Sequence, residues 1–128
     1  MTTAGIGSLA GVPDAPVLDE SIIDGLRRLG DDVLVEIVRL WCDNLEPNVA
    51  AMRSALAAGE RPALAAAAHT LRGSAANVGA TRLSVACGAL ETAGRDTTDE
   101  AMLAGMLTTI TDEAAVAVTA MTALLQEQ

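Results

Sequence analysis

His69 is the only histidine in the chain, and it lies within the stretch AAAAHTLRGSAANVGA, residues 65–80. A neutral imidazole is a nucleophile near physiological pH, and an exposed one needs little activation. Arg72 follows three positions later, so on a helix its guanidinium lies on the same surface, where it can hold phosphate oxygens. A nucleophile beside such a cation predicts phosphoryl chemistry at His69.

Gly73 lies one helical turn after His69, in a segment that otherwise uses alanine freely. Glycine inside a helix costs about 1 kcal/mol relative to alanine, so the missing Cβ needs a reason. One interpretation is that the gap clears space beside the imidazole for a phosphoryl group. The alternatives are plainer: Gly73 permits close packing of helices, Arg72 is a solvated charge, and a lone surface histidine has no special role.

The helical phase of this segment predicts which way His69 points. At 3.6 residues per turn, five apolar residues form the expected buried stripe: Leu64, Ala68, Leu71, Ala75 and Val78. His69 lies about 140° from that line, so we expect it to face solvent. Its face is nearly bare of charge and is shared by Ala65, Ala66, Arg72, Gly73 and Ala76. A bare apolar surface of this kind indicates a docking site for another protein.

The elements that carry these residues are predicted to be helices. Hydrophobic residues make up 51% of the 128 residues, Phe and Tyr are absent, and Trp41 is the only aromatic residue. A core of Leu, Val, Ile, Met and Ala suits packed helices better than sheets. The length fits one domain. We therefore expect an all-α fold.

Capping and turn signals divide the chain into a flexible leader, residues 1–17, and a folded domain, residues 18–128. The signals predict a short helix and then four longer ones, with ends marked by Asp19 and Gly30, Asp31 or Asp32 and Gly59, Pro62 and Gly79, Thr81 and Gly94, and Thr98. Pro47 is expected to kink or reset the second of these helices. The last helix has an inward seam of Leu103, Leu107, Ile110, Ala114, Ala117, Met121 and Leu124. The simplest arrangement is an antiparallel up-down four-helix bundle with a short extra N-terminal helix.

Charge and cysteine usage exclude several function classes. The net charge is −9 with no block of basic residues, which argues against nucleic acid or an anionic membrane as partner. Cys42 and Cys87 lie far apart and form no CxxC pair, so neither a disulfide framework nor a metal site is expected. The N-terminus lacks the features of a signal peptide, and the last apolar window is interrupted by Asp112 and Glu113. We expect a soluble, cytoplasmic protein whose partners are proteins.

The segment from His69 to Ser74, HTLRGS, together with Gly79-Ala80 and Leu90-Glu91, resembles the histidine-containing phosphotransfer (HPt) family of bacterial two-component phosphorelays. The resemblance covers residues 19–125 and implies a four-helix bundle with an exposed, phosphorylated histidine. It implies that His69 accepts a phosphoryl group from a receiver-domain aspartate and passes it to another receiver. Arg72 stands where the family has a lysine near the phosphoryl group, and Gly73 keeps the steric gap.

The resemblance also implies roles for Glu91 and Arg95 on the next helix, where they lie near the histidine and contribute to partner binding. The implied partners are receiver domains of a hybrid sensor histidine kinase and of response regulators. The chain is expected to bind no cofactor, and Mg²⁺ is expected in the receiver during transfer. Because the sequence contains no Gly-rich or P-loop element for ATP, we expect a phosphocarrier without kinase activity of its own. One exposed docking face suits a monomer.

Two other functions are open at this point. The phosphoacceptor helix of a sensor kinase has the motif H-E-x-[RK]-x-P, but here Thr70 replaces the acid and Ser74 the proline. A phosphate-independent helical adaptor would instead bind a receiver or kinase through the His69 face. Substitution of His69 by Gln separates the adaptor from a phosphotransfer protein, because only the adaptor would keep its function.

Overall fold

The computed structural model describes residues 15–127 and is helical throughout, with no strand among the described residues. Its five helices are α2 (Glu20–Arg27), α3 (Asp31–Ala57), α4 (Arg61–Asn77), α5 (Thr81–Asp96) and α6 (Glu100–Gln126). The four longer helices are joined by turns of residues 58–60, 78–80 and 97–99. Such short connections force consecutive helices to run antiparallel. The predicted all-α fold is confirmed.

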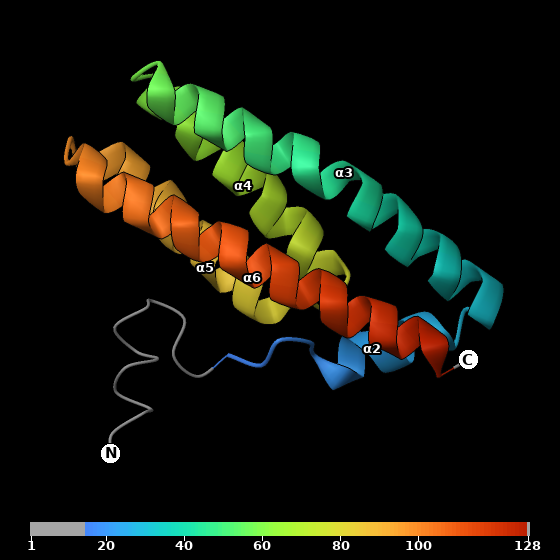
Figure 1. Ribbon diagram of the computed structural model, residues 1–128. Helices are drawn as coiled ribbons and strands as arrows, with labels where there is room; N and C mark the ends of the chain where they lie inside the picture. The colour runs from blue at the N-terminus through green and yellow to red at the C-terminus, as the bar shows by residue number, and fades with distance from the viewer. Residues whose placement is uncertain (1–14, 128) are drawn as a thin grey trace.

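The four long helices form a bundle in which each helix packs against two others. α4 contacts α3 and α5, and α6 contacts the same two helices from the other side. α4 and α5 lie behind α3 and α6 in Figure 1, with α2 against the end where the chain terminates. Arg27 of α2 lies near Glu127 there, with Nη2 and Oε1 3.9 Å apart. This is the predicted antiparallel bundle with a short extra helix.

The core is built from one face of each helix. All five residues of the predicted stripe on α4 are buried, and so are all seven residues of the predicted seam on α6. By length and hydropathy alone, α6 is the one helix in the described part of the chain that could cross a membrane. Its seam instead packs in the core with Leu34, Met52 and Leu90. We therefore interpret α6 as a core helix of the bundle.

Several helix ends differ from the predictions by a few residues. Asp19 caps α2 as predicted, since its carboxylate accepts hydrogen bonds from the Ser21 and Ile22 backbone N–H groups at 2.9 and 3.3 Å. The cap of α6 is Asp99 rather than Thr98, with the Met102 N–H donating to its carboxylate at 3.0 Å. α3 begins directly after Gly30, whose φ of 116° suits glycine, so Asp31 is its first residue.

Two further predictions about the ends of α5 were wrong in detail. Thr81 is the first residue of α5 rather than its cap, because Ala80 occupies the cap position. Gly94 does not end α5, which continues to Asp96 and stops where Thr97 turns extended. Gly94 is instead buried inside the helix. Pro47 lies within α3, which continues through it to Ala57, so the proline does not end the helix.

The predicted leader, residues 1–17, lies mostly outside the described residues. Of its described part, the Pro16 carbonyl accepts a hydrogen bond from the Arg82 N–H at 3.0 Å, and the Asp19 N–H donates to the Gly79 carbonyl at 2.7 Å. Contacts with the bundle therefore begin earlier than Asp19. These bonds fasten the start of α2 to the turn between α4 and α5.

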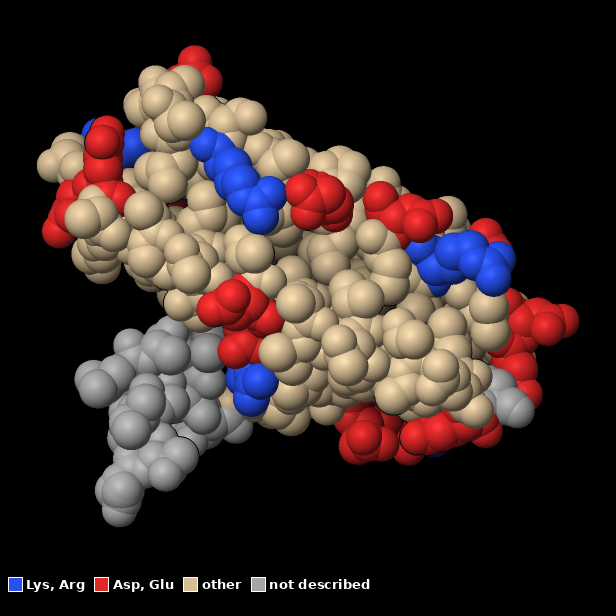
Figure 2. Space-filling view, in the orientation of Figure 1, with Lys and Arg blue, Asp and Glu red and all other residues tan. Residues whose placement is uncertain are grey.

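Figure 2 shows the face formed by α3 and α6, where charged side chains are scattered between broad uncharged areas. The other side of the bundle, formed by α4 and α5, carries His69.

Candidate functional site

His69 lies on the outer face of α4, as its helical phase predicted. Its side chain is 59% exposed, whereas the neighbouring Ala68 and Leu71 are fully buried. The backbone of α4 is held from within by this buried stripe, so the imidazole stands on a rigid support. Its exposure is confirmed.

Glu91 of α5 reaches the imidazole from below and is the one buried charged residue among those described. Its carboxylate has three partners: Oε2 lies 2.9 Å from both His69 Nδ1 and Arg95 Nη2, and Oε1 lies 2.9 Å from Arg72 Nε. Sequence similarity placed Glu91 near the histidine, which is confirmed. The residue is only 6% exposed, so it offers a partner little surface, and its part in partner binding stays a prediction.

The surroundings of Glu91 keep its carboxylate ionised. Burial alone raises the pKa of Glu91, but the hydrogen bonds from Arg72 and His69 and the charges of these groups outweigh burial. The pKa of Glu91 therefore lies below its ordinary value. An ionised carboxylate at this position favours a proton on the nearest nitrogen of the imidazole.

Two side chains approach the same nitrogen of His69. Arg72 Nη2 lies 3.0 Å from Nδ1, in addition to the Glu91 contact, and Nδ1 cannot both donate to the carboxylate and accept from the guanidinium. The bond to the ionised carboxylate is the stronger one because it is charge-assisted. We therefore assign the proton to Nδ1. This leaves the lone pair on Nε2, which has no hydrogen-bond partner among the described residues.

Gly88 of α5 makes room for Arg72 and was missed by the sequence analysis. A Cβ at Gly88 would lie 3.1 Å from the Arg72 Cδ, so the arginine stem occupies the space that a side chain would fill. The hydroxyl of Ser84 donates to the Arg72 carbonyl at 3.0 Å and ties α5 to α4 at this level. The available signal was the same as for Gly73, a glycine in a helix interior, three residues before Glu91.

Gly73 is exposed, and a Cβ built on it would meet nothing within 4 Å. Close helix packing therefore does not explain this glycine, and that alternative was wrong. The missing side chain leaves space on the outside of α4, one turn beyond His69. A requirement for that space must come from something outside the described chain.

The predicted alanine platform around His69 is present in part. Ala66 and Ala76 are exposed as expected. Ala65 is only 2% exposed, so its predicted exposure was wrong. The reason is the close approach of α5, where a Cβ at Gly94 would lie 3.6 Å from the Ala65 Cβ. Helical phase on α4 alone does not reveal how far a neighbouring helix covers its flank.

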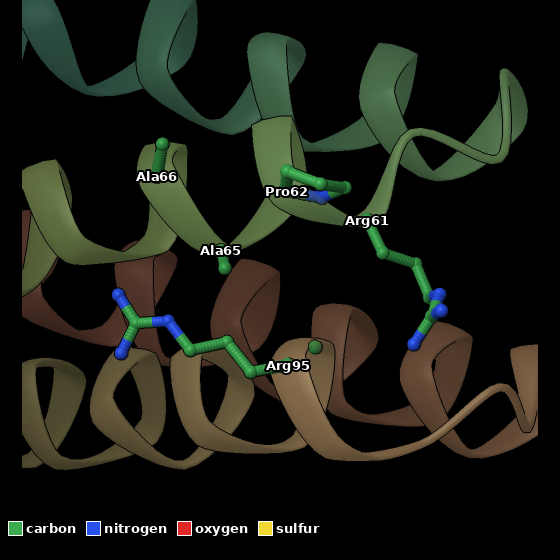
Figure 3. Close-up of a pocket in the computed structure, with 6 residues that line it drawn as sticks. Arg61, Pro62, Ala65, Ala66 and Arg95 are labelled. Carbon is green, nitrogen blue, oxygen red and sulfur yellow. The ribbon is translucent and has the colours of Figure 1, made fainter.

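Arg95 lies at the edge of the site, as predicted, and borders a hollow of about 330 Å³ between α4 and α5. The hollow is lined by Arg61, Pro62, Ala65, Ala66, Gly94 and Arg95. In Figure 3 the two arginine side chains lie on opposite sides of Ala65 and Pro62, and Arg95 extends along α5. The Arg61 Nη1 donates to the Thr97 carbonyl at 2.8 Å. Sequence analysis did not identify Arg61.

The cysteines offer no reactive thiol near His69. Burial raises the pKa of Cys87 to about 12, although the Arg72 charge lowers it slightly. Burial, with the nearby Asp43 charge, also raises the pKa of Cys42. Both thiols are therefore protonated at neutral pH.

Two solved structures share this fold. Histidine-containing phosphotransfer protein B (HptB) from Pseudomonas aeruginosa PAO1 has a TM-score of 0.80 and 24% identity, over 90% of this chain and 99% of that chain. A rice protein assigned as a histidine-containing phosphotransfer protein has a TM-score of 0.76 and 20% identity, over 97% of this chain and 91% of that one. No curated sequence is similar enough to this chain to count as a match.

The sequence of this chain also matches a family model. The model is that of the Hpt domain, and the match covers residues 36–128, which include α4, α5 and every side chain that surrounds His69. The chain belongs to the Hpt domain family.

Proposed function

We propose that His69 is the phosphorylated residue of a phosphorelay intermediate, accepting a phosphoryl group from the aspartate of one receiver domain and passing it to another. The observation that carries this proposal is the contact between the buried Glu91 carboxylate and His69 Nδ1, at 2.9 Å. That contact orients an exposed imidazole and leaves Nε2 as the free nucleophile. Family membership and the fold support the same role.

In the forward step the Nε2 lone pair attacks phosphorus in line with the leaving oxygen of the receiver's acyl phosphate. The new N–P bond forms as the P–O bond to the aspartate breaks, and the carboxylate leaves with the bonding electron pair. The proton stays on Nδ1, so the phosphorylated ring is cationic. The Glu91 carboxylate, 2.9 Å from Nδ1, stabilises that developing charge.

The return step runs the same chemistry in reverse. A carboxylate of the second receiver attacks phosphorus, the N–P bond breaks, and neutral His69 is regenerated with its proton still on Nδ1. No ATP is consumed, consistent with a phosphocarrier rather than a kinase. The receiver supplies the Mg²⁺ and much of the charge stabilisation, and the present chain supplies the nucleophile and the docking surface.

Arg72 and Gly73 complete the proposed site. The Arg72 guanidinium has one nitrogen on Glu91 and another beside Nδ1 of the imidazole. We propose that it turns towards Nε2 and binds the oxygens of a phosphoryl group on that nitrogen. Gly73 leaves the adjacent space open. The exposed Ala66 and Ala76 offer a smooth surface for a receiver, and Arg95 borders it. We further propose that the protein acts in the cytoplasm as a monomer, with its partners docking on the single face that carries His69.

The test is transfer of a radioactive phosphoryl group from a panel of phosphorylated receiver domains. The wild-type chain should become labelled, and the label should be lost in acid and kept in base, as expected of a phosphohistidine. His69→Gln should not become labelled. Thr70→Ala is the matched control, because Thr70 is an exposed hydroxyl beside His69, and it should be labelled like wild type.

Two outcomes would contradict the proposal. One is an absence of label on the wild-type chain with every receiver of the panel. The other is equal labelling of wild type and His69→Gln. If His69→Gln still binds a receiver and still supports the downstream response, the chain acts as a phosphate-independent adaptor instead.

A further inference from the structure

The hollow between the start of α4 and the end of α5 lies one helical turn before His69. Ala65 precedes His69 by four residues, so the two positions are separated by about 6 Å along the helix axis. Its volume of about 330 Å³ exists because Ala65, Ala66 and Gly94 carry little or no side chain. Carbon atoms of these residues and of Pro62 form its floor, and two guanidinium groups border it.

Each of these guanidinium groups is held in place by one contact and has further N–H donors. Arg61 donates through Nη1 to the Thr97 carbonyl at 2.8 Å, and Arg95 contacts Glu91 through Nη2 at 2.9 Å. A guanidinium has five N–H donors. Each arginine is therefore oriented by one contact and retains donors for an acceptor that enters the hollow.

The lining of the hollow carries two arginines and no acid, whereas the whole protein is acidic. The chain has a net charge of −9 and eight arginines, three of which, Arg61, Arg95 and Arg72, lie at the hollow and beside His69. The acid between the last two, Glu91, is buried beneath them. Glu60 and Asp96 are exposed near the same end, but neither pairs with Arg61 or Arg95. The hollow therefore complements a carboxylate.

We propose that the hollow receives an acidic side chain of the receiver domain that docks on His69, and that Arg61 is a specificity-determining residue for this partner. The inference rests on the proposed function, because the receiver is defined by its transfer to His69. The methyl groups and the proline accommodate the methylene carbons of an Asp or Glu, while the Arg61 guanidinium at the rim binds its oxygens. Continuity with the His69 face favours a protein side chain over a free anion.

The test compares transfer kinetics of charge-reversal variants with a receiver identified by the labelling experiment. Arg61→Glu should raise the KM for the phosphorylated receiver about tenfold and leave the rate at saturating receiver unchanged. An acid at the first position of α4 is compatible with the helix N-terminus, so the fold should be kept. Ala66→Glu places the same charge in the hollow while preserving the Arg61–Thr97 bond, and should also raise KM.

Arg53→Glu is the matched control. Arg53 is exposed and borders the groove between α3 and α6, away from His69, so the same change of net charge there should leave KM unchanged. Substitution of exposed acids of the receiver by Arg, one at a time, should reveal one position at which the receiver variant restores a low KM to Arg61→Glu. Such a rescue identifies the entering carboxylate.

The possible failures are distinguishable. If the wild-type chain accepts no phosphoryl group from any receiver, the proposed function fails and this inference falls with it. If wild-type transfer is intact but Arg61→Glu and Ala66→Glu keep the wild-type KM, this inference alone is overturned. It is also overturned if Arg53→Glu raises KM as much as Arg61→Glu, since the effect would then follow net charge rather than the hollow.

Discussion

Glu91 of α5 holds the imidazole of His69 on α4, with Oε2 2.9 Å from Nδ1. The same carboxylate also contacts Arg72 and Arg95, so one buried acid organises all the charged groups around the proposed nucleophile. The exposed part of the site consists of flexible side chains, while its anchor lies inside the bundle. Orientation of the imidazole is therefore determined by the packing of α4 against α5.

Removal of the Glu91 side chain should slow phosphotransfer without changing the fold. Glu91→Ala removes the negative charge that stabilises the cationic ring, and we expect a fall in transfer rate of about a hundredfold. Glu91→Gln keeps a hydrogen-bond acceptor for Nδ1–H but loses the charge, so its loss should be smaller. Rapid-quench measurement of phosphohistidine formation checks both values.

The control for these variants is Glu46→Gln, which removes an exposed acid paired with Arg53 on α3. It should transfer phosphoryl groups at the wild-type rate. Equal rates for Glu91→Ala and wild type would show that the carboxylate has no part in orienting or stabilising the imidazole.

The pH dependence of stability should carry the signature of Glu91. Burial raises the pKa of Glu91, but its contacts with Arg72 and His69 lower that pKa by more than burial raises it. The pKa of Glu91 in the folded protein is therefore below the ordinary value of 4.5. A carboxylate with a lower pKa in the folded state stabilises the fold above its unfolded-state pKa and loses that effect as the pH falls through its folded-state pKa. Wild type should therefore keep the same stability advantage over Glu91→Gln, measured as free energy of unfolding, between about pH 7 and about pH 5. This advantage should decrease as the pH falls below about 4.5.

Urea unfolding of both proteins at a series of pH values measures this difference. Glu46→Gln should show no comparable trend, because its carboxylate is exposed. A difference between wild type and Glu91→Gln that disappears above pH 5 would contradict the lowered pKa.

The two cysteines should differ in their reaction with a thiol reagent. Cys87 is fully buried and its pKa is raised to about 12, whereas Cys42 is partly exposed and its pKa is raised less. Because the thiolate is the reactive form, the native protein should be modified slowly at Cys42 and not measurably at Cys87. With Ellman's reagent, the native protein should show slow reaction of one thiol, and the unfolded protein should show rapid reaction of both. Rapid native modification of Cys87 would show that α5 opens locally.

Much of the fold followed from periodicity, since the α4 stripe and the α6 seam were placed inward by helical phase alone. The exposure of His69 followed in the same way. Ala65 and Glu91 show where this reasoning stops, because their burial depends on how closely α5 approaches α4. That approach is set by Gly94 and Gly88, small residues on the other helix. Helical phase predicts which residues of a single helix face inward. A site between two helices also depends on the distance between those helices.

Gly88→Ala should disturb the site indirectly through Arg72. The new Cβ would lie 3.1 Å from the Arg72 Cδ, so the flexible arginine stem must move by a few tenths of an ångström. The Arg72–Glu91 contact should weaken, and transfer should slow by several-fold, about fivefold or less. The free energy of unfolding should rise by less than the roughly 1 kcal/mol that replacement of glycine by alanine gives inside a helix. An unchanged rate in the rapid-quench assay would show that the position of Arg72 is not critical.

Gly73 provides the sharpest separation of function from stability. Because a Cβ there meets nothing within 4 Å, Gly73→Ala should stabilise α4 by about 1 kcal/mol through helix propensity alone. Gly73→Gln should also fold, yet its side chain would occupy the space beside His69 and should abolish transfer. The matched control is Gly105→Ala on α6, another exposed helical glycine whose added Cβ meets nothing within 4 Å. It should give the same gain in thermal stability with wild-type transfer, whereas undiminished transfer by Gly73→Gln would contradict the proposed role of the gap.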